Sequence, residues 1–143
     1  MADAIPFKLV TPAQVVFDGM AELVIAVTTE GEEGILPKHA PFLAALKPGV
    51  LRANVRPASG GEGNATRLEL ATGEGFMQAL PDRLTVLVDE ALAFDDVVVA
   101  TAREQLAQAS DRQKGEAPGS ERFAREQAVI DFANAQLRLT GHR

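Results

Sequence analysis

The hydrophobic pattern of this chain changes its period near Asp89, and this change limits the fold more than any other feature. Before it, short apolar segments are separated by turn residues, and residues 51–56 alternate strictly between apolar and polar, as in a half-buried strand. From Phe94 onward, Ala, Gln, Glu and Arg dominate, and these residues mostly favour helix. The sequence therefore predicts a β domain over residues 1–90 and a helical domain over residues 91–143.

The first part contains many short strand-like segments with turn signals between them, which is typical of a sandwich or barrel. Asp18-Gly19 and Lys47-Pro48-Gly49 are expected to form turns, and residues 57–64 a flexible glycine-rich tip. Residues 29–41 carry two glycines and two prolines, which predicts a long surface loop with only a short extended piece at Ile35-Leu36. The expected strands cover residues 5–10, 14–17, 22–28, 42–46, 51–56, 66–70, 75–80 and 84–88.

The second part predicts two helices that form an antiparallel hairpin. Asp95 is expected to cap the first helix and Ser120 the second, with a break at residues 115–119. Apolar residues that lie off the helical stripes, such as Val129 and Phe132, are expected to cover the sandwich or a partner. The stripes consist of Val99, Ala102, Leu106 and Ala109 in the first helix, and Phe123, Ile130, Ala133 and Leu137 in the second.

Composition argues against several classes of function. The 143 residues include no cysteine, so disulfides, thiol nucleophiles and thiolate metal sites are absent. The formal net charge is −6, and the 14 basic residues are scattered, whereas a nucleic-acid-binding domain needs a clustered basic face. No apolar run approaches the roughly 20 residues of a membrane helix. We expect a soluble protein that binds no nucleic acid and reaches a membrane only through other proteins.

The sequence offers little that supports catalysis. Only His39 and His142 could act as histidine bases, and no activated nucleophile accompanies either of them. The acidic residues within 30–33 do not have the spacing of a calcium-binding loop, and the histidines have no ligand spacing for zinc. Neither glycine-rich phosphate-binding motif is present. We therefore expect a binding or structural component without catalytic residues, metal or cofactor.

The polar segment 30–41 carries the most specific signal in the chain. It reads Glu-Gly-Glu-Glu-Gly-Ile-Leu-Pro-Lys-His-Ala-Pro and is followed at 46–52 by Leu-Lys-Pro-Gly-Val-Leu-Arg. This combination resembles the epsilon subunit of the bacterial F-type proton-translocating ATP synthase. The match extends over residues 5–90, and over 91–143 it rests on architecture and length. The resemblance implies a ten-stranded β-sandwich followed by a C-terminal antiparallel two-helix hairpin.

The resemblance also implies a non-catalytic rotor subunit. Such a subunit lies at the foot of the central stalk, peripheral to the cytoplasmic face of the bacterial inner membrane. It binds the gamma subunit and the ring of c subunits, and it couples proton flow to ATP synthesis on other chains. Carried over by position, Glu32 and His39 are the expected c-ring contacts, and an acidic loop can pair with basic or amide groups there. The gamma contact is expected to use an apolar face of the sandwich.

Some relatives bind ATP on the hairpin through a motif of Ile or Leu, Asp, two variable residues, Arg and Ala. Asp96 and Ala100 match this motif, but Asp95 stands at the aliphatic position and Val99 replaces the arginine. A cation that could meet phosphate is therefore missing, with Arg103 one turn further as an alternative. We expect ATP binding to be weak or absent.

Other relatives inhibit ATP hydrolysis by extending the hairpin toward the alpha and beta subunits. Arg122, Arg125 and Arg138 are the candidate inhibitory contacts here. Neighbouring acidic residues of the same helix offset much of their charge, so inhibition remains an open question.

Two other classes of function stay open. A free-standing adaptor or carbohydrate-binding sandwich would use exposed aromatic residues, but the chain has no Trp or Tyr. A small enzyme with His39 as base would need a nucleophile or paired acid that the sequence does not identify. A His39→Ala substitution distinguishes them, because an enzyme would lose turnover whereas a rotor part would lose at most coupling or assembly.

Overall fold

The fold combines a β-sandwich with a pair of helices. A computed structural model describes residues 3–57 and 65–141, so residues 58–64 of the expected glycine-rich tip, and His142, lie outside this part. The described residues form nine strands, one fewer than the resemblance implies, and the expected architecture of sandwich plus hairpin is confirmed. The elements are β1 (Ile5–Val10), β2 (Val15–Thr28), β3 (Gly31–Ile35), β4 (Phe42–Leu46), β5 (Gly49–Pro57), β6 (Thr66–Thr72), β7 (Gly75–Leu80), β8 (Arg83–Val88), β9 (Ala91–Leu92), the 3₁₀ helix η1 (Phe94–Asp96), α1 (Val99–Lys114) and α2 (Glu121–Leu139).

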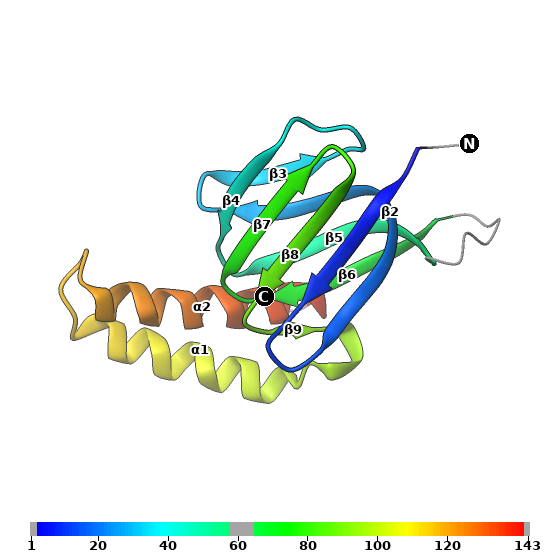
Figure 1. Ribbon diagram of the computed structural model, residues 1–143. Helices are drawn as coiled ribbons and strands as arrows, with labels where there is room; N and C mark the ends of the chain where they lie inside the picture. The colour runs from blue at the N-terminus through cyan, green and yellow to red at the C-terminus, as the bar shows by residue number, and fades with distance from the viewer. Residues whose placement is uncertain (1–2, 58–64, 142–143) are drawn as a thin grey trace.

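The strands form two layers that the long strand β2 joins (Figure 1). One layer has the order β1-β8-β7-β4, and the other has the order β2-β5-β6-β9 with β3 on the free side of β2. The first strand pairs with β2 in antiparallel fashion, with Ile5 opposite Ala21. It also pairs with β8 in parallel, with Phe7 opposite Leu84. Because β1 contacts both neighbours, it closes one side of the sandwich.

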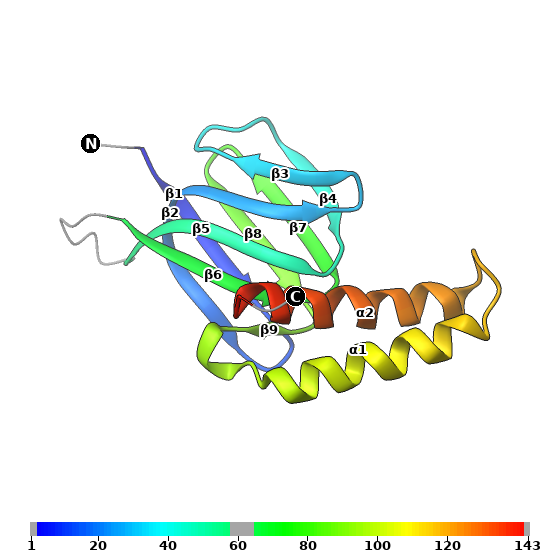
Figure 2. The ribbon, with the colours of Figure 1, turned by 180° about the vertical axis from the view of Figure 1, so that it is seen from behind.

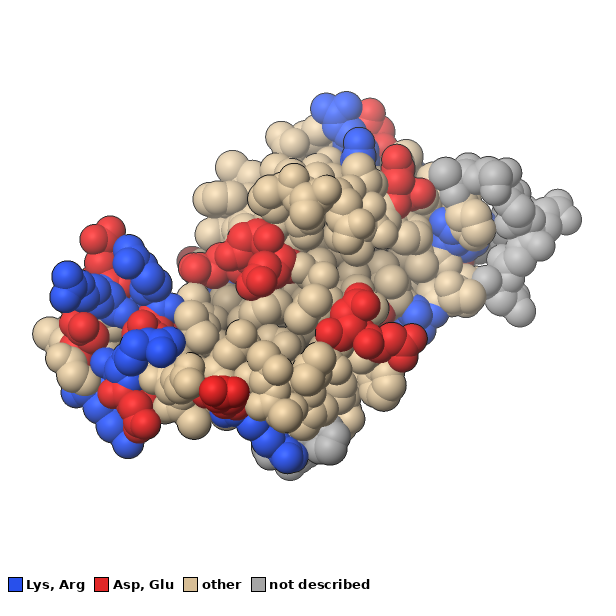
Figure 3. Space-filling view, turned by 90° about the horizontal axis from the view of Figure 1, so that it is seen from below, with Lys and Arg blue, Asp and Glu red and all other residues tan. Residues whose placement is uncertain are grey.

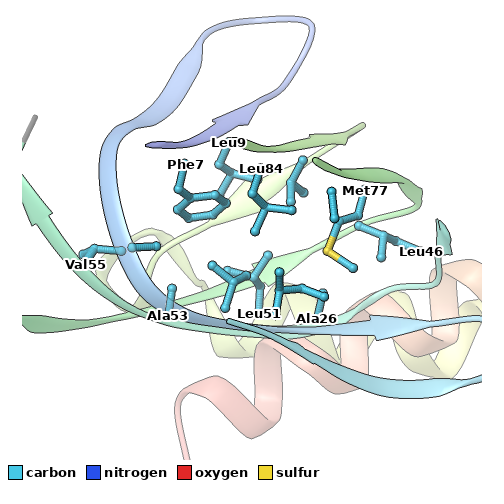
Figure 4. Close-up of a cluster of buried hydrophobic side chains, with 14 of the residues drawn as sticks. Phe7, Leu9, Ala26, Leu46, Leu51, Ala53, Val55, Met77 and Leu84 are labelled. Carbon is cyan, nitrogen blue, oxygen red and sulfur yellow. The ribbon is translucent and has the colours of Figure 1, made fainter. Parts of the chain in front are cut away.

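Alternating side chains of the two layers meet in a single core. Phe7, Met77 and Leu84 from the first layer point toward Leu51 and Ala53 of the second (Figure 4). All five are at most 1% exposed. Complete burial of one large apolar side chain contributes about 1.5–3 kcal/mol, so this cluster is the main source of stability for the sandwich. The buried residues of β5 follow the two-residue period that the sequence predicts.

The expected turn at Asp18-Gly19 does not exist, because this dipeptide lies inside β2. The two strands expected over residues 14–17 and 22–28 are therefore one continuous strand. A Cβ on Gly19 would lie only 2.7 Å from the carbonyl oxygen of Arg56, so this glycine serves the close approach of β5 rather than a turn. The strand accommodates its bend by a register shift between Ala21 and Leu23.

The expected long loop is also shorter than predicted, because β3 occupies its first half. This strand pairs with β2 through a tight turn in which the Thr28 hydroxyl donates to the Gly31 carbonyl at 2.7 Å. The same hydroxyl accepts from the Glu30 amide at 3.1 Å, and Gly31 has a φ of +118°, a region that favours glycine. Glycine and glutamate are depleted in strands, so the composition of residues 31–35 did not predict β3. Only residues 36–41 remain as a loop.

The two α-helices form an antiparallel hairpin, and α2 packs on β5 and β6 (Figure 2). Ser120 caps α2 as expected, since the Phe123 amide donates to its hydroxyl at 3.1 Å. Across the hairpin, the Gln113 amide donates to the Gln127 side chain at 2.8 Å. Among the described residues, Lys47 and Asp131 form an ion pair between sandwich and helix with an N···O distance of 3.9 Å, and the half-exposed lysine keeps its contribution small. Packing therefore holds the hairpin in place more than charge does.

The expected cap at Asp95 is wrong. Asp95 lies within η1, and the residue that precedes α1 is Val98, whose side chain makes no capping hydrogen bond. The neighbouring Asp96 carboxylate accepts from the Ala93 amide at 3.4 Å, so an acidic residue stabilises the 3₁₀ turn instead of the helix. In the part of the chain that is described, neither helix has the length and apolar content to cross a membrane.

Candidate functional site

Glu32 lies on the exposed face of β3 and is already paired. Its Oε1 accepts a hydrogen bond from Arg52 Nη2 at 2.8 Å, across the neighbouring sheet surface. The Glu32 side chain remains 60% exposed, so a partner can still reach the carboxylate. An approaching amide or basic group would therefore meet an acid–arginine pair and not an isolated acid. Sequence reasoning missed Arg52, because nothing in the sequence relates two residues on different strands.

His39 lies in the loop between β3 and β4, where several contacts fix its position. Its Nδ1 is 2.8 Å from the Ala40 carbonyl oxygen and must donate, since that oxygen can only accept. The imidazole ring also packs on Phe42, with centroids 4.9 Å apart. The preceding Lys38 has a φ of +66° and pairs with Asp3 at 3.8 Å. The ring is therefore held in place by its hydrogen bond to the loop and by its packing on Phe42.

The structure does not bring Glu32 and His39 together. Glu32 is opposite Val27 near the start of β3, whereas His39 follows the end of that strand at Ile35. The three residues from Glu32 to Ile35 alone span roughly 10 Å of strand. If both residues contact a partner, they do so at two separate points.

The outer surface of the first layer carries an apolar patch. Leu43, Phe76 and Leu87 are 70%, 56% and 53% exposed, and we call these three residues the apolar face. Phe76 is directly opposite Leu87 across β7 and β8, and Leu43 lies on β4, the other neighbour of β7. The helices lie against the other layer and leave this surface uncovered (Figure 1). Exposed clusters of large apolar side chains usually mark an interaction site.

The three residues assigned to the nucleotide motif do not form one site. Asp96 lines a cavity of about 440 Å³ between the sandwich and the hairpin. Val99 and Ala100 are the first residues of α1, and neither is among the residues that line this cavity. Arg103 is exposed on α1 and does not line it either. The residues present thus offer a phosphate group few donors at this place.

The three candidate inhibitory arginines are also apart. Arg122 is exposed near the start of α2, and Arg125 lines the 440 Å³ cavity. Arg138, near the end of the same helix, borders a smaller hollow of about 220 Å³ together with Glu32 and Arg52. From the first to the last of these arginines the helix rises roughly 24 Å. They do not form one basic patch in this arrangement.

Charge is distributed unevenly over the underside of the molecule. Acidic and basic side chains are intermixed at the free end of the hairpin, whereas several acidic groups stand among uncharged residues nearer the sandwich (Figure 3). At the free end, the hydrogen bond to Glu126 raises the pKa of the Arg112 guanidinium. Near the sandwich, burial and then the charge of Asp89 raise the pKa of the Glu90 carboxyl.

Residues 4–94 match the family model described as "ATP synthase, Delta/Epsilon chain, beta-sandwich domain". The chain belongs to the family of ATP synthase epsilon chains. One such epsilon chain, from Chromobacterium violaceum, is 36% identical over 131 residues, which cover 92% of this chain and 89% of the relative. An ATP synthase epsilon chain is a non-catalytic subunit of that enzyme, so catalytic residues are not expected on it.

Solved structures of ATP synthases contain chains with the fold of this epsilon chain. In a Euglena gracilis mitochondrial ATP synthase, described as OSCP/F1/c-ring, a chain has a TM-score of 0.72 at 16% identity and covers 97% of this chain, with 82% of its own length matched. In a Tetrahymena thermophila central stalk and c-ring, the TM-score is 0.57 at 20% identity, with 94% and 97% coverage. At these identities the likeness shows the fold alone. The fold is thus shared with chains in both of these ATP synthase structures.

Proposed function

We propose that this epsilon chain is a rotor subunit, which joins the gamma subunit to the c-ring and couples proton flow to ATP synthesis. The observation that carries the proposal is the uncovered apolar face on one side of a sandwich whose other side is covered by α2. A permanent partner explains why this face exposes three large apolar side chains. We assign the gamma contact to Leu43, Phe76 and Leu87.

The c-ring contact is assigned to Glu32 and His39. Both are accessible, and the pairing of Glu32 with Arg52 presents an acceptor and a donor to polar loops of the ring. The two partner surfaces adjoin, because Phe42, which packs against His39, directly precedes Leu43 of the apolar face. One rigid sandwich would therefore hold gamma and the c-ring at fixed positions relative to each other, as torque transmission requires. The subunit would be peripheral to the cytoplasmic face of the inner membrane, held there by these partners.

We assign coupling to residues 1–90 and any regulation to residues 91–143. Arg125 and Arg138 are exposed but border hollows against the sandwich, and we assign their engagement with the alpha and beta subunits to a state in which α2 has left β5 and β6. The docked chain should therefore inhibit ATP hydrolysis weakly. ATP itself should bind weakly or not at all, because Val99 supplies no cation and the charged residues that line the nearby cavity are four carboxylates and one arginine.

Single-cysteine cross-linking tests the partner assignments, since the native chain has no cysteine. In membranes reconstituted with the complete enzyme, Leu43→Cys should cross-link to gamma and Glu32→Cys to a c subunit. Glu104→Cys, on an exposed position of α1, serves as the control and should link to neither. Both cross-links should leave ATP-driven proton pumping intact, because rotor parts turn together. Links from Leu43→Cys to a stator subunit, or loss of pumping after either cross-link, would contradict the rotor proposal.

A further inference from the structure

The outer surface of the second layer carries charges of both signs on neighbouring strands. Arg52 on β5 is directly opposite Glu69 on β6, and its Nη2 donates to Oε1 of Glu32 on β3 at 2.8 Å. Opposite residues of paired strands have their side chains close together on one face of the sheet. The Arg52 guanidinium therefore lies between two carboxylates, and we call Glu32, Arg52 and Glu69 the charged row.

Helix α2 ends over the charged row. Its C-terminal part lies against β5 and β6 (Figure 2), and the hollow of about 220 Å³ at this place is lined by Arg138 and Leu139 together with all three members of the row. Among the residues that the structure describes, Arg138 belongs to no ion pair. Docking of the helix thus brings a second guanidinium to the hollow, and no single carboxylate fixes it.

The position of α2 changes the charge that a partner meets at Glu32. With the helix docked, two carboxylates and two guanidiniums surround the hollow, so their formal charges cancel. With the helix away, Arg138 is absent and the charged row keeps a net negative charge. Physiological salt screens charges over about 8 Å, so groups that border one small hollow still affect each other. A cationic group therefore binds at Glu32 more favourably when α2 has left the sandwich.

We propose that hairpin docking and c-ring binding are coupled through Arg138 and the charged row, so that each weakens the other. The inference rests on the assignment of the c-ring contact to Glu32, and it specifies a basic side chain of the ring at that contact. Coupling between two sites is reciprocal, so a ring that binds the undocked chain more tightly also favours undocking. Exposed ion pairs change an equilibrium by a factor of about 1.5 to 5. The assembled subunit thus holds its hairpin less firmly than the free chain does.

A cysteine at position 135 reports how often α2 leaves the sandwich, because the native chain has no cysteine. Ala135 is 1% exposed and lies one helical turn from both Asp131, which pairs with Lys47 of the sandwich, and Leu139. Residues at this spacing share one face of a helix. The sandwich therefore covers the thiol of Ala135→Cys, and a maleimide reaches it when α2 undocks. Ala53→Cys, in the sandwich core, reports complete unfolding and should react more slowly.

The free full-length chain tests the charges in a double-mutant cycle on the Ala135→Cys background. Glu32→Gln and Arg138→Gln should each raise the labelling rate by a factor of about 1.5 to 5, because each removes a charge that favours docking. The double variant should react about as fast as Arg138→Gln, since Glu32 acts on docking through that arginine. Glu33→Gln is the matched control, because Glu33 points to the other face of β3 and borders a different hollow. It should leave the rate unchanged.

The second measurement adds a complex of gamma and the c-ring that lacks its own epsilon chain. Sedimentation shows how much of the chain is bound, and labelling of Ala135→Cys is measured on the same sample. The bound chain should react faster than the free chain by a factor of about 1.5 to 5. Arg138→Gln should remove most of this difference while the chain still binds.

The cycle refutes the coupling if neither single variant changes the rate, if the two effects multiply in the double variant, or if Glu33→Gln accelerates labelling equally. A bound chain that reacts at the free rate would also refute it, although the rotor proposal would stand because binding was observed. Acceleration that persists in Arg138→Gln would show that gamma or the ring displaces α2 directly. A chain that does not bind the complex would refute the rotor proposal and the ring's part in the coupling together.

Discussion

Removal of one aromatic ring from the apolar face should weaken the gamma contact strongly. The change is Phe76→Ala, on a strand whose two neighbours carry the other residues of the face. Phe76 is 56% exposed in the free chain, and a phenylalanine side chain presents about 200 Å², so about 110 Å² is available to a partner. At about 25 cal/mol per Å², complete burial of that area contributes about 3 kcal/mol, or roughly a hundredfold in Kd.

The control variant removes a similar exposed aromatic area at another place on the surface. Phe94 is 60% exposed on η1, outside the apolar face, so Phe94→Ala removes a similar area without touching the proposed contact. The buried remainder of Phe76 contributes about 2 kcal/mol to folding, so circular dichroism must show that each variant is folded at the assay temperature.

Affinity should be measured by isothermal titration against an ATP synthase head that contains gamma but lacks its own epsilon subunit. We expect a large loss for Phe76→Ala and an affinity near that of the native chain for Phe94→Ala. If Phe76→Ala binds within about threefold of the native chain, gamma does not bury this face. If Phe94→Ala is weakened as much, the contact lies at the base of the hairpin instead.

Three further predictions concern stability. A Cβ at Gly75 would collide with the Leu87 carbonyl, which cannot move without opening β7 from β8, so Gly75→Ala should lower the free energy of unfolding in urea by about 2–3 kcal/mol. Gly34→Ala is the control, because its Cβ would have its nearest neighbour at 3.8 Å, and it should lower the free energy of unfolding by less than about 1 kcal/mol. Equal losses in the two variants would contradict this reasoning. Burial and the charge of Asp89 raise the pKa of the Glu90 carboxyl above its usual 4.5, so ionisation is less favourable in the folded than in the unfolded chain, and stability falls as pH rises from 4.5 through the folded-state pKa. Glu90→Gln should therefore raise Tm near pH 7 and leave it unchanged below about pH 4. A lower Tm of the variant at neutral pH would instead show that Glu90 has a cationic partner. Ser120→Ala removes the 3.1 Å cap on α2 and should cost about 1 kcal/mol in thermal unfolding followed by far-UV circular dichroism, whereas Ser120→Asp should retain most of it.

Local signals in the sequence predicted elements correctly where neighbours along the chain decide the structure. Ser120 is such a case, because its hydroxyl needs only an amide three residues further to become a cap. Asp95 has the same chemistry but fails as a cap, since Asp96 stabilises a 3₁₀ turn just before the helix. Asp18-Gly19 is a strong turn signal, yet β1 and β5 pair with this segment and keep it extended. Pairing between distant strands overrides local propensity there.

The candidate sites show the same limit more sharply. The two-residue period indicates that Phe76 and Leu87 each lie on an outward face, but only the register of β7 against β8 places them side by side. The pairing of Glu32 with Arg52 likewise depends on how the strands are arranged. The cavity between the sandwich and the hairpin is lined in part by residues of two turns and a 3₁₀ helix, which the sequence presents as ordinary connections. Such sites are not visible until the topology is known.

The parallel pairing of β1 with β8 has a consequence for the order in which this chain folds. Phe7 and Leu84 are neighbours in space, although most of the sandwich lies between them in sequence. Closing so long a loop is entropically costly and slow, whereas α1 and α2 meet through a short connection. β1 is synthesised before β8, so it can be paired on both sides only after most of the sandwich has been made. We therefore expect β1, although it is made early, to be among the last elements to reach its complete set of hydrogen bonds.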